Sequence, residues 1–197
     1  MTSTLGHGFL TVPPTTRERQ HLYDNDVHEV GYVMNLSLLW AQLPDAKVTW
    51  ESLLMLAVET AGLTFRQRAL LVSACAATLG DAYCSLAWGN RLAGTSDPAL
   101  AAAVVIGDDS RLGHDERVLT SWARAITRDP NSTTRRDVQA LRDAGYSEQQ
   151  IFAITLFVAL RIAFSTVNDA LGAAPDRELI DAVAPALRNA VTFGRQP

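Results

Sequence analysis

The chain has 197 residues, of which 48% are hydrophobic and 19% are charged, and its formal net charge at neutral pH is −4. This length suits a single domain with one buried core. An acidic chain without a run of Lys or Arg gives no reason to expect a nucleic-acid partner, and its 2 cysteines do not make a disulfide scaffold.

The sequence shows no clear targeting signal. Its N-terminus lacks a basic segment followed by an apolar run, which is the pattern of a secretory signal. The longest apolar run, residues 151–160, is too short to span a bilayer. We therefore expect a soluble cytoplasmic protein with no membrane partner, and the excess of Arg over Lys points to a bacterial source with GC-rich DNA.

Apolar residues recur with helical spacing along nearly the whole chain, and no segment alternates with period two, which predicts an all-α fold. Thr64 and Ser147 each precede a glutamine by three residues, the capping-box pattern that begins a helix, and Asp97 before Pro98 is another helix start. Gly62, Gly80 and Gly145 are predicted helix stops. Further helices are expected over residues 17–43, 48–61, 114–129 and 176–194.

The helix predicted after Ser147 contains the sequence FAITLFVALRIAF, which is apolar on nearly every face. Such a helix must be buried, either centrally or in an oligomer interface, and for a chain of this length we favour burial between the subunits of a homo-oligomer. Arg161 interrupts the apolar surface and is expected either to pair with an acid, in the same chain or across a subunit interface, or to bind a substrate carboxylate. Asn168 and Asp169 are explained by solvation at the helix end.

Three stretches carry a family resemblance: LTFRQRALLVSACAATLGDAYCSLAWGNRLAG (63–94), LGHDERVLTSWARAITRDP (112–130) and FSTVNDALGAAPD (164–176). In their order and spacing they resemble the AhpD-like alkylhydroperoxidase and carboxymuconolactone decarboxylase superfamily. The resemblance implies an AhpD-like helical bundle. Residues 63–197 would form one continuous core, with residues 1–62 as an N-terminal helical extension packed on it.

The resemblance also locates the redox motif of the family. In that motif two cysteines form C-x-x-C, a glutamate lies twelve residues before the first, and a histidine lies four residues after the second. This chain has Ala69, Asp81, Cys84 and Trp88 at those positions, so only the second cysteine is kept. The resemblance therefore implies the helical scaffold and the pocket of the family, and the changed residues argue against the redox chemistry of its two cysteines.

Cys84 is expected at the third position of a helix capped by Asp81, where the helix dipole stabilises a thiolate. The Asp81 carboxylate should raise the pKa of the thiol and oppose the dipole. Without a second cysteine, oxidised Cys84 would need an external thiol to reduce it. Cys75 lies among Ala and Leu and is expected to be a core residue with no disulfide to Cys84.

Three residues near Cys84 each have a structural and a functional interpretation. Asp81 either caps its helix only or also acts as the acid or base of a site that moves protons instead of electrons. Tyr83 either packs in the core or donates its hydroxyl proton. Trp88 either belongs to the core or forms a flat apolar wall that favours an aromatic or polyene substrate.

His28 lies beside acidic residues, which is typical of a solvated helix face. It becomes a candidate base only if the N-terminal layer covers the pocket. The sequence has no recognisable metal-ligand spacing, no dinucleotide-binding glycine motif and no phosphate loop, so we expect neither a metal nor a cofactor.

The sequence thus favours a homo-oligomeric enzyme that needs no cofactor and acts on a small, largely apolar organic molecule by acid–base chemistry, such as decarboxylation, rearrangement or cyclisation. The catalytic candidates are Asp81, Cys84 and Tyr83, and the substrate-binding candidates are Trp88, His28 and Arg161. Two alternatives stay open. One is a thiol-dependent hydroperoxidase that uses Cys84 alone, and the other is a non-catalytic binding or assembly protein.

Overall fold

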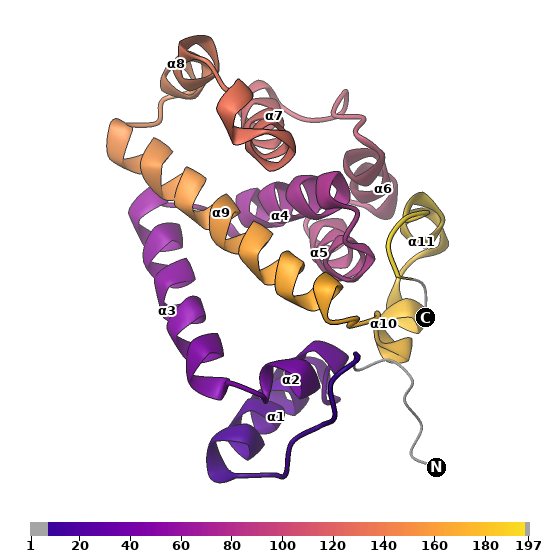
Figure 1. Cartoon of the computed structure of the whole chain (residues 1–197). Helices are drawn as coiled ribbons and strands as arrows, with labels where there is room; N and C mark the ends of the chain where they lie inside the picture. Colours follow the sequence, from indigo (N-terminus) through magenta and orange to yellow (C-terminus); the bar gives the residue numbers. More distant parts are fainter. Residues whose placement is uncertain (1–7, 196–197) are drawn as a thin grey trace.

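A computed structural model describes residues 8–195, and within that range the chain forms α-helices, one short 3-10 helix and no strand (Figure 1). The predicted all-α fold is confirmed. The N-terminal residues used to look for a secretory signal lie partly outside this range. The helices are α1 (Arg17–Val30), α2 (Asn35–Trp40), α3 (Pro44–Ala61), α4 (Phe65–Leu79), α5 (Ala82–Gly94), α6 (Pro98–Ile106), α7 (His114–Arg128), η1 (Pro130–Ser132), α8 (Arg135–Asp143), α9 (Glu148–Ala170), α10 (Arg177–Ala182) and α11 (Pro185–Ala190).

Most predicted helix ends are confirmed. Thr64 and Ser147 both form capping boxes, at the starts of α4 and α9. The Asp97 side chain accepts a hydrogen bond from the Leu100 N–H at the start of α6. The three predicted stops at Gly62, Gly80 and Gly145 all have positive φ, the left-handed conformation that favours glycine.

Two predicted helices are each divided in the structure. The segment 17–43 forms α1 and α2, because Gly31 takes a φ of 89° and ends α1. The segment 176–194 forms α10 and α11, since Pro185 disfavours helical geometry at the residue before it and Ala184 is extended. In addition, α3 begins at Pro44, four residues before the expected start.

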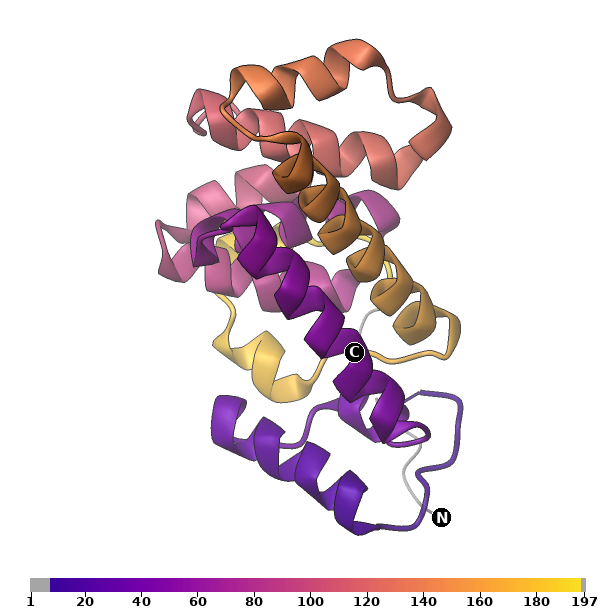
Figure 2. The ribbon, with the colours of Figure 1, turned by 90° about the vertical axis from the view of Figure 1, so that its left-hand side faces the viewer.

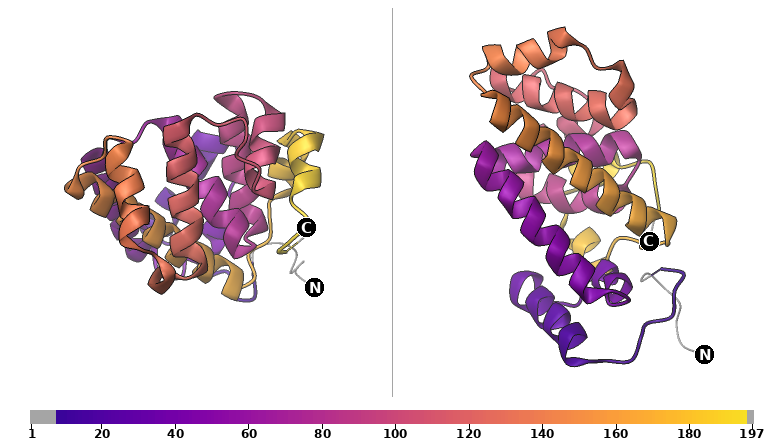
Figure 3. Two further views of the ribbon diagram at one scale, coloured as in Figure 1. Left: turned by 90° about the horizontal axis from the view of Figure 1, so that it is seen from above. Right: turned by 60° about the vertical axis from the view of Figure 1, so that its left-hand side comes forward.

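The helices are arranged around α4 and α5, which lie in the middle of the molecule with α3 and α9 beside them (Figure 1). α4 packs against α5, α7 and α9, and α3 packs along α9. Turned by 90°, the molecule has α1 and α2 at one end and α7 and α8 at the other (Figure 2). The same two ends are separated in the right-hand view of Figure 3.

α4 contributes to both of the large apolar clusters that make up the core. Its Leu70 belongs to the cluster formed with α5, α6, α10 and α11, whereas Leu71 belongs to the cluster formed with α3, α7 and α9. A helix between two clusters must be apolar on more than one face, and every residue of α4 from Ala69 to Ala76 is buried. Cys75 is 1% exposed in the second cluster, so its predicted core position is confirmed.

α9 is long and apolar enough to cross a membrane by length and composition alone. Nine of its 23 residues are buried against the rest of the chain, however. Its other face exposes apolar side chains, among them Phe152 at 72% and Val167 at 37%. The single chain therefore buries one face of α9, and burial of the other face between subunits stays a prediction.

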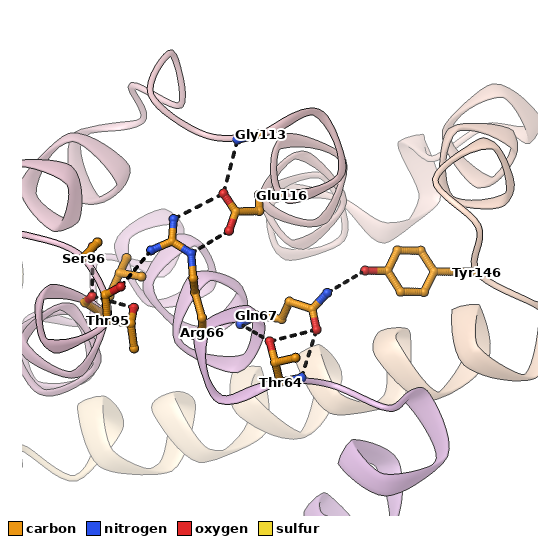
Figure 4. Close-up of polar contacts among 9 residues, drawn as sticks. Thr64, Arg66, Gln67, Thr95, Ser96, Gly113, Glu116 and Tyr146 are labelled. Atoms are coloured by element: carbon orange, nitrogen blue, oxygen red, sulfur yellow. Dashed lines mark hydrogen bonds and ion pairs between the residues drawn. The ribbon is translucent and has the colours of Figure 1, made fainter.

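A polar cluster joins the start of α4 to α7 and to the end of α5 (Figure 4). Arg66 donates to both carboxylate oxygens of Glu116, at 2.6 and 3.3 Å, and to the Thr95 carbonyl oxygen at 3.5 Å. Glu116 also accepts the Gly113 N–H at 3.2 Å. Both charged side chains are partly exposed, so we expect the cluster to fix helix positions while adding little to the free energy of unfolding.

The hydrogen bond between Trp40 and Asn168 gives a test of the packing of α2 on α9. The indole N–H donates to Asn168 Oδ1 at 2.8 Å, and Asn168 is 0% exposed. Trp40→Phe retains an aromatic ring against Phe164 but removes the donor. We expect urea titration to show a loss of about 1–3 kcal/mol in the free energy of unfolding, because a buried acceptor is left unpaired. In an Asn168→Leu background the same change should cost much less, and equal losses in both backgrounds would contradict this role.

Candidate active site

The break between α4 and α5 positions Asp81. Gly80 has a φ of 81° and ends α4, and Asp81 follows in an extended conformation. Asp81 Oδ1 accepts the Cys84 N–H at 2.8 Å, which confirms the predicted helix cap. Asp81 is 0% exposed, and its Oδ2 has no hydrogen-bond partner among the described residues. One carboxylate oxygen therefore serves the helix, and the other is free.

Cys84 is the third residue of α5, as expected, and it is buried. Arg161 Nη2 donates to Cys84 Sγ at 3.2 Å. Burial raises the pKa of the Cys84 thiol well above its usual value and the Asp81 carboxylate raises it further, whereas the Arg161 charge and a hydrogen bond with Ser165 lower it. The resting thiol is therefore protonated at neutral pH, and Arg161 is the group placed to stabilise a thiolate.

Aromatic rings surround the Arg161 guanidinium. Its central carbon lies 5.4 Å from the ring centroids of Trp50 and Trp88 and 4.9 Å from that of Phe164. The faces of such rings attract a cation. Arg161 is 5% exposed and forms no ion pair within the described part of the chain, so its pairing with an acid across a subunit interface, or with a substrate carboxylate, stays a prediction.

Arg161 belongs to a buried stripe on the second half of α9. The other members are Phe164, Ser165 and Asn168, and spacings of three and four residues place all of them on one helix face. The predicted solvation of Asn168 is wrong, because this residue is buried and accepts a hydrogen bond from Trp40. The stripe thus brings polar groups to the side of α5 that carries Cys84.

Tyr83 directly precedes Cys84 in the sequence and is buried. Its hydroxyl group donates a hydrogen bond to the Asp176 carboxylate. Asp176 Oδ1 also accepts the Asn35 N–H at 2.7 Å. Burial and the Asp176 carboxylate raise the pKa of Tyr83 far above its usual value. Tyr83 therefore links α5 to α2 and α10, and its proton is already engaged.

Trp88 and His28, both substrate-binding candidates, differ in their surroundings. Trp88 is half-buried one turn after Cys84, and its ring contacts Arg161, Arg91 and Phe65. The group formed by Asp81, Cys84 and Arg161 is called the centre below. Trp88 lies beside this centre, as expected of a residue that forms one wall of a pocket. His28 is exposed in the last turn of α1, and no contact described for it reaches Cys84, so its role as a base stays a prediction without structural support.

The end of the chain covers the start of α5. Gly194 approaches so closely that a Cβ on it would lie 2.8 Å from the Ala82 nitrogen, and it has a φ of 69°. The neighbouring Arg195 donates to the Asp169 carbonyl oxygen at 3.2 Å. Burial and the charge of Asp81 raise the pKa of the half-buried Asp169 to about 7. This tail helps to seal Asp81 from solvent.

Several residues of the centre were not predicted from the sequence. They come from segments far apart in the chain, and they are Trp50, Arg91, Phe164, Ser165 and Asp176. The sequence offered a signal only for the residues of α9. Arg161, Phe164, Ser165 and Asn168 are spaced by three and four positions, which places polar residues on one face of a largely apolar helix. Among residues 8–195, no group of three or more His, Cys, Asp or Glu side chains could hold a metal ion.

These helices and their order define an AhpD-like all-α fold, and comparison with solved structures agrees. A peroxidase-related protein from Silicibacter sp. TM1040 superposes with a TM-score of 0.78 at 20% identity, over 91% of this chain and 97% of that chain. An AhpD-core, peroxidase-related protein from Ralstonia eutropha JMP134 superposes with a TM-score of 0.76 at 20% identity, over 87% and 94%.

The debrominase Bmp8 has the same fold, with a TM-score of 0.71 at 15% identity over 97% of this chain and 100% of that chain. A cysteine-to-alanine variant of Bmp8 in complex with 2,3,4-tribromopyrrole superposes with a TM-score of 0.69 at 16% identity, over 93% and 97%. No family model and no curated protein sequence matches the chain. Similarity at these identities shows the fold alone.

Asp169 should make the stability of the protein depend on pH. An aspartate in an unfolded chain titrates near 3.9, whereas Asp169 titrates at about 7 in the folded protein, so between these values the folded state binds more protons. Its contribution to stability is complete at low pH and is lost as the pH rises to about 7. In Asp169→Asn this contribution is absent. We expect the unfolding temperature of the unmodified protein, relative to the variant, to fall between about pH 4 and pH 7, and parallel curves would refute the assignment.

Proposed function

We propose that this chain is an enzyme in which Asp81 transfers protons to and from a small, largely apolar organic molecule without a cofactor. The observation that carries the proposal is the fully buried Asp81 carboxylate, whose second oxygen accepts no N–H or O–H group of the described chain and lies next to the Cys84 thiol, which in turn contacts the Arg161 cation. Buried polar groups normally have a hydrogen-bond partner, and a catalytic role is one explanation for a buried carboxylate oxygen that lacks one. The peroxidase-related and debrominase neighbours support an enzyme of this fold in general.

The residues of the centre divide the chemistry between them. Asp81 Oδ2 removes a proton from a carbon next to a carbonyl group and returns it at another position. Arg161 retains an N–H donor at Nε that no described group accepts, and it stabilises negative charge that develops on the carbonyl oxygen. Trp50 and Trp88 bind the apolar body of the molecule. Decarboxylation, rearrangement and cyclisation all require this combination of proton transfer and charge stabilisation.

Proton exchange gives a test that does not depend on knowing the natural substrate. The protein is incubated in D2O with a panel of unsaturated lactones, cyclic ketones and β-keto acids, and loss of the C–H signals is followed by NMR. Asp81→Asn should lower the exchange rate by about 100-fold or more, because the amide cannot act as a general base. Cys84→Ser should retain most of the rate.

Asp81→Asn is a suitable variant because asparagine caps a helix as well as aspartate does. Asp81→Ala should lose the rate as well and about 1 kcal/mol of stability. Asp97→Asn is the matched control, because Asp97 caps α6 by the same bond to the third helical N–H but lies away from the centre. Exchange that survives Asp81→Asn, or no exchange with any member of the panel, would rule out the proposed reaction.

A second candidate function rests on the contact between Arg161 and Cys84, which places a cation 3.2 Å from the sulfur. In a one-cysteine hydroperoxidase, the Cys84 thiolate attacks the terminal oxygen of a hydroperoxide, the O–O bond breaks, and the alcohol leaves with a proton. The sulfur is then a sulfenic acid, which an external dithiol reduces to the thiol while it forms its own disulfide and water. Burial of Cys84 and the nearby Asp81 carboxylate disfavour this reaction, because both raise the thiol pKa.

The two functions predict opposite results with one set of variants. With cumene hydroperoxide and dithiothreitol, the hydroperoxidase would lose all turnover in Cys84→Ser and about tenfold or more in Arg161→Gln, which removes the charge beside the sulfur. The acid–base enzyme would show no hydroperoxide turnover in any variant. A protein inactive in both assays would be the binding or assembly protein that remains as the third interpretation.

A further inference from the structure

Two arginines without a carboxylate partner lie against one tryptophan ring. The guanidinium carbon of Arg91 is 5.0 Å from the Trp88 ring centroid, and that of Arg161 is 5.4 Å from the same centroid. Neither forms an ion pair with any residue that the structure describes. Five other arginines in the described part of the chain form ion pairs, among them Arg66 with Glu116 and Arg124 with Asp109.

Keeping these two cations close together is unfavourable. Burial lowers the pKa of Arg91, and the positive charge of Arg161 lowers it further, whereas the charge of Glu29 raises it without reaching ion-pair distance. Arg161 is more deeply buried, and its Nε–H has no acceptor within the described chain. An anion between the two guanidinium groups would relieve the repulsion and accept the unused N–H group.

A hollow of about 300 Å³ leads to Arg91 from the surface. It is formed by the end of α1, the segment before α2, one face of α5, and α10. Its lining includes Tyr32, Met34, Tyr83, Ala87, Arg91 and Leu179. Arg91 shares the Trp88 ring with Arg161, and Arg161 donates to Cys84 Sγ. Arg91 therefore lies between the hollow and the centre at Arg161 and Cys84.

The composition of the hollow restricts the ligand. Its walls are mainly aromatic and aliphatic, which suits a flat apolar body. Glu29, Asp176 and Glu178 also line it, and Asp176 already accepts hydrogen bonds from the Tyr83 hydroxyl and the Asn35 N–H. These carboxylates repel every anion and repel one with two or more negative charges most, so the ligand carries a single anionic group that reaches past them to Arg91.

We propose that the hollow admits a small aromatic or conjugated monocarboxylate, whose flat body lies against Met34, Ala87 and Leu179 while its carboxylate binds Arg91 and, behind it, Arg161. A planar carboxylate matches the paired N–H donors of guanidinium groups better than a spherical anion does. The inference names the substrate class of the enzyme proposed above and rests on that proposal for the reaction, although binding can be measured without turnover. Arg91 then selects the ligand at the entrance, and Arg161 holds it beside Asp81.

Isothermal titration calorimetry with 1-naphthoate and its neutral counterpart 1-naphthamide tests the charge requirement. We expect naphthoate to bind about tenfold or more tightly than the amide and than inorganic phosphate. Arg91→Gln should weaken naphthoate binding by about tenfold and leave naphthamide unchanged. Equal affinities for acid and amide, no binding of naphthoate, tight binding of phosphate, or an unchanged affinity in Arg91→Gln would each overturn the proposal.

Controls separate this inference from protein stability and from the proposed reaction. Arg161→Gln should also weaken binding, but it changes a buried residue, so half-buried Arg91 carries the test if that variant does not fold. Arg111→Gln is the matched control, because it removes an exposed arginine paired with Asp97 on another helix. Naphthoate should bind Asp81→Asn at least as tightly as it binds the unmodified protein, because the variant loses a negative charge near the bound anion and keeps both arginines. Intact binding with no proton exchange in any variant would reject the reaction alone, whereas exchange without selective binding would reject the ligand class alone.

Discussion

The burial of the Arg161 guanidinium is the constraint on which the centre of this molecule depends. A buried cation normally costs several kcal/mol unless a carboxylate or hydrogen bonds compensate for its lost hydration. Here the compensation comes from the Cys84 sulfur and from Trp50, Trp88 and Phe164, contributed by α3, α5 and α9. These three helices must therefore converge on one point. The same point also positions helix α2, because the Trp40 ring stacks on the Phe164 ring with 5.1 Å between the ring centroids.

The second constraint is the short connection between α4 and α5. Gly80 turns the chain with a positive φ, and the next residue must cap α5 from a buried position. Any side chain at that position faces the centre, whether or not it reacts. Because Asp81 needs only one oxygen for the cap, the local structure leaves the other oxygen for chemistry at no cost to helix formation. The structural and catalytic interpretations of Asp81 are therefore compatible.

The sequence predicted those features that depend on local rules. The caps at Thr64, Asp81, Asp97 and Ser147 follow from side chains that reach a backbone N–H two or three residues away. The divisions of the first and last helices were missed, although Gly31 and Pro185 mark them, because amphipathic spacing continues across both breaks. The partners of Arg161 could not be predicted, since Trp50 lies 111 positions before it and only the packing of α3 along α9 brings them together.

Helix packing and the site depend on different residues, and this explains how one fold can carry different chemistry. Helix packing needs only apolar faces of the right size, so structures at 15–20% identity keep the arrangement. The reactive centre, in contrast, depends on a few side chains at the start of α5 and on the α9 stripe. A carboxylate at the cap position and an unpaired cation opposite it favour movement of protons and stabilisation of an anion. On this argument Arg161 and Arg91, more than Cys84, decide which molecules the proposed centre can accept, because a buried and a half-buried cation held close together favour an anion over a neutral molecule.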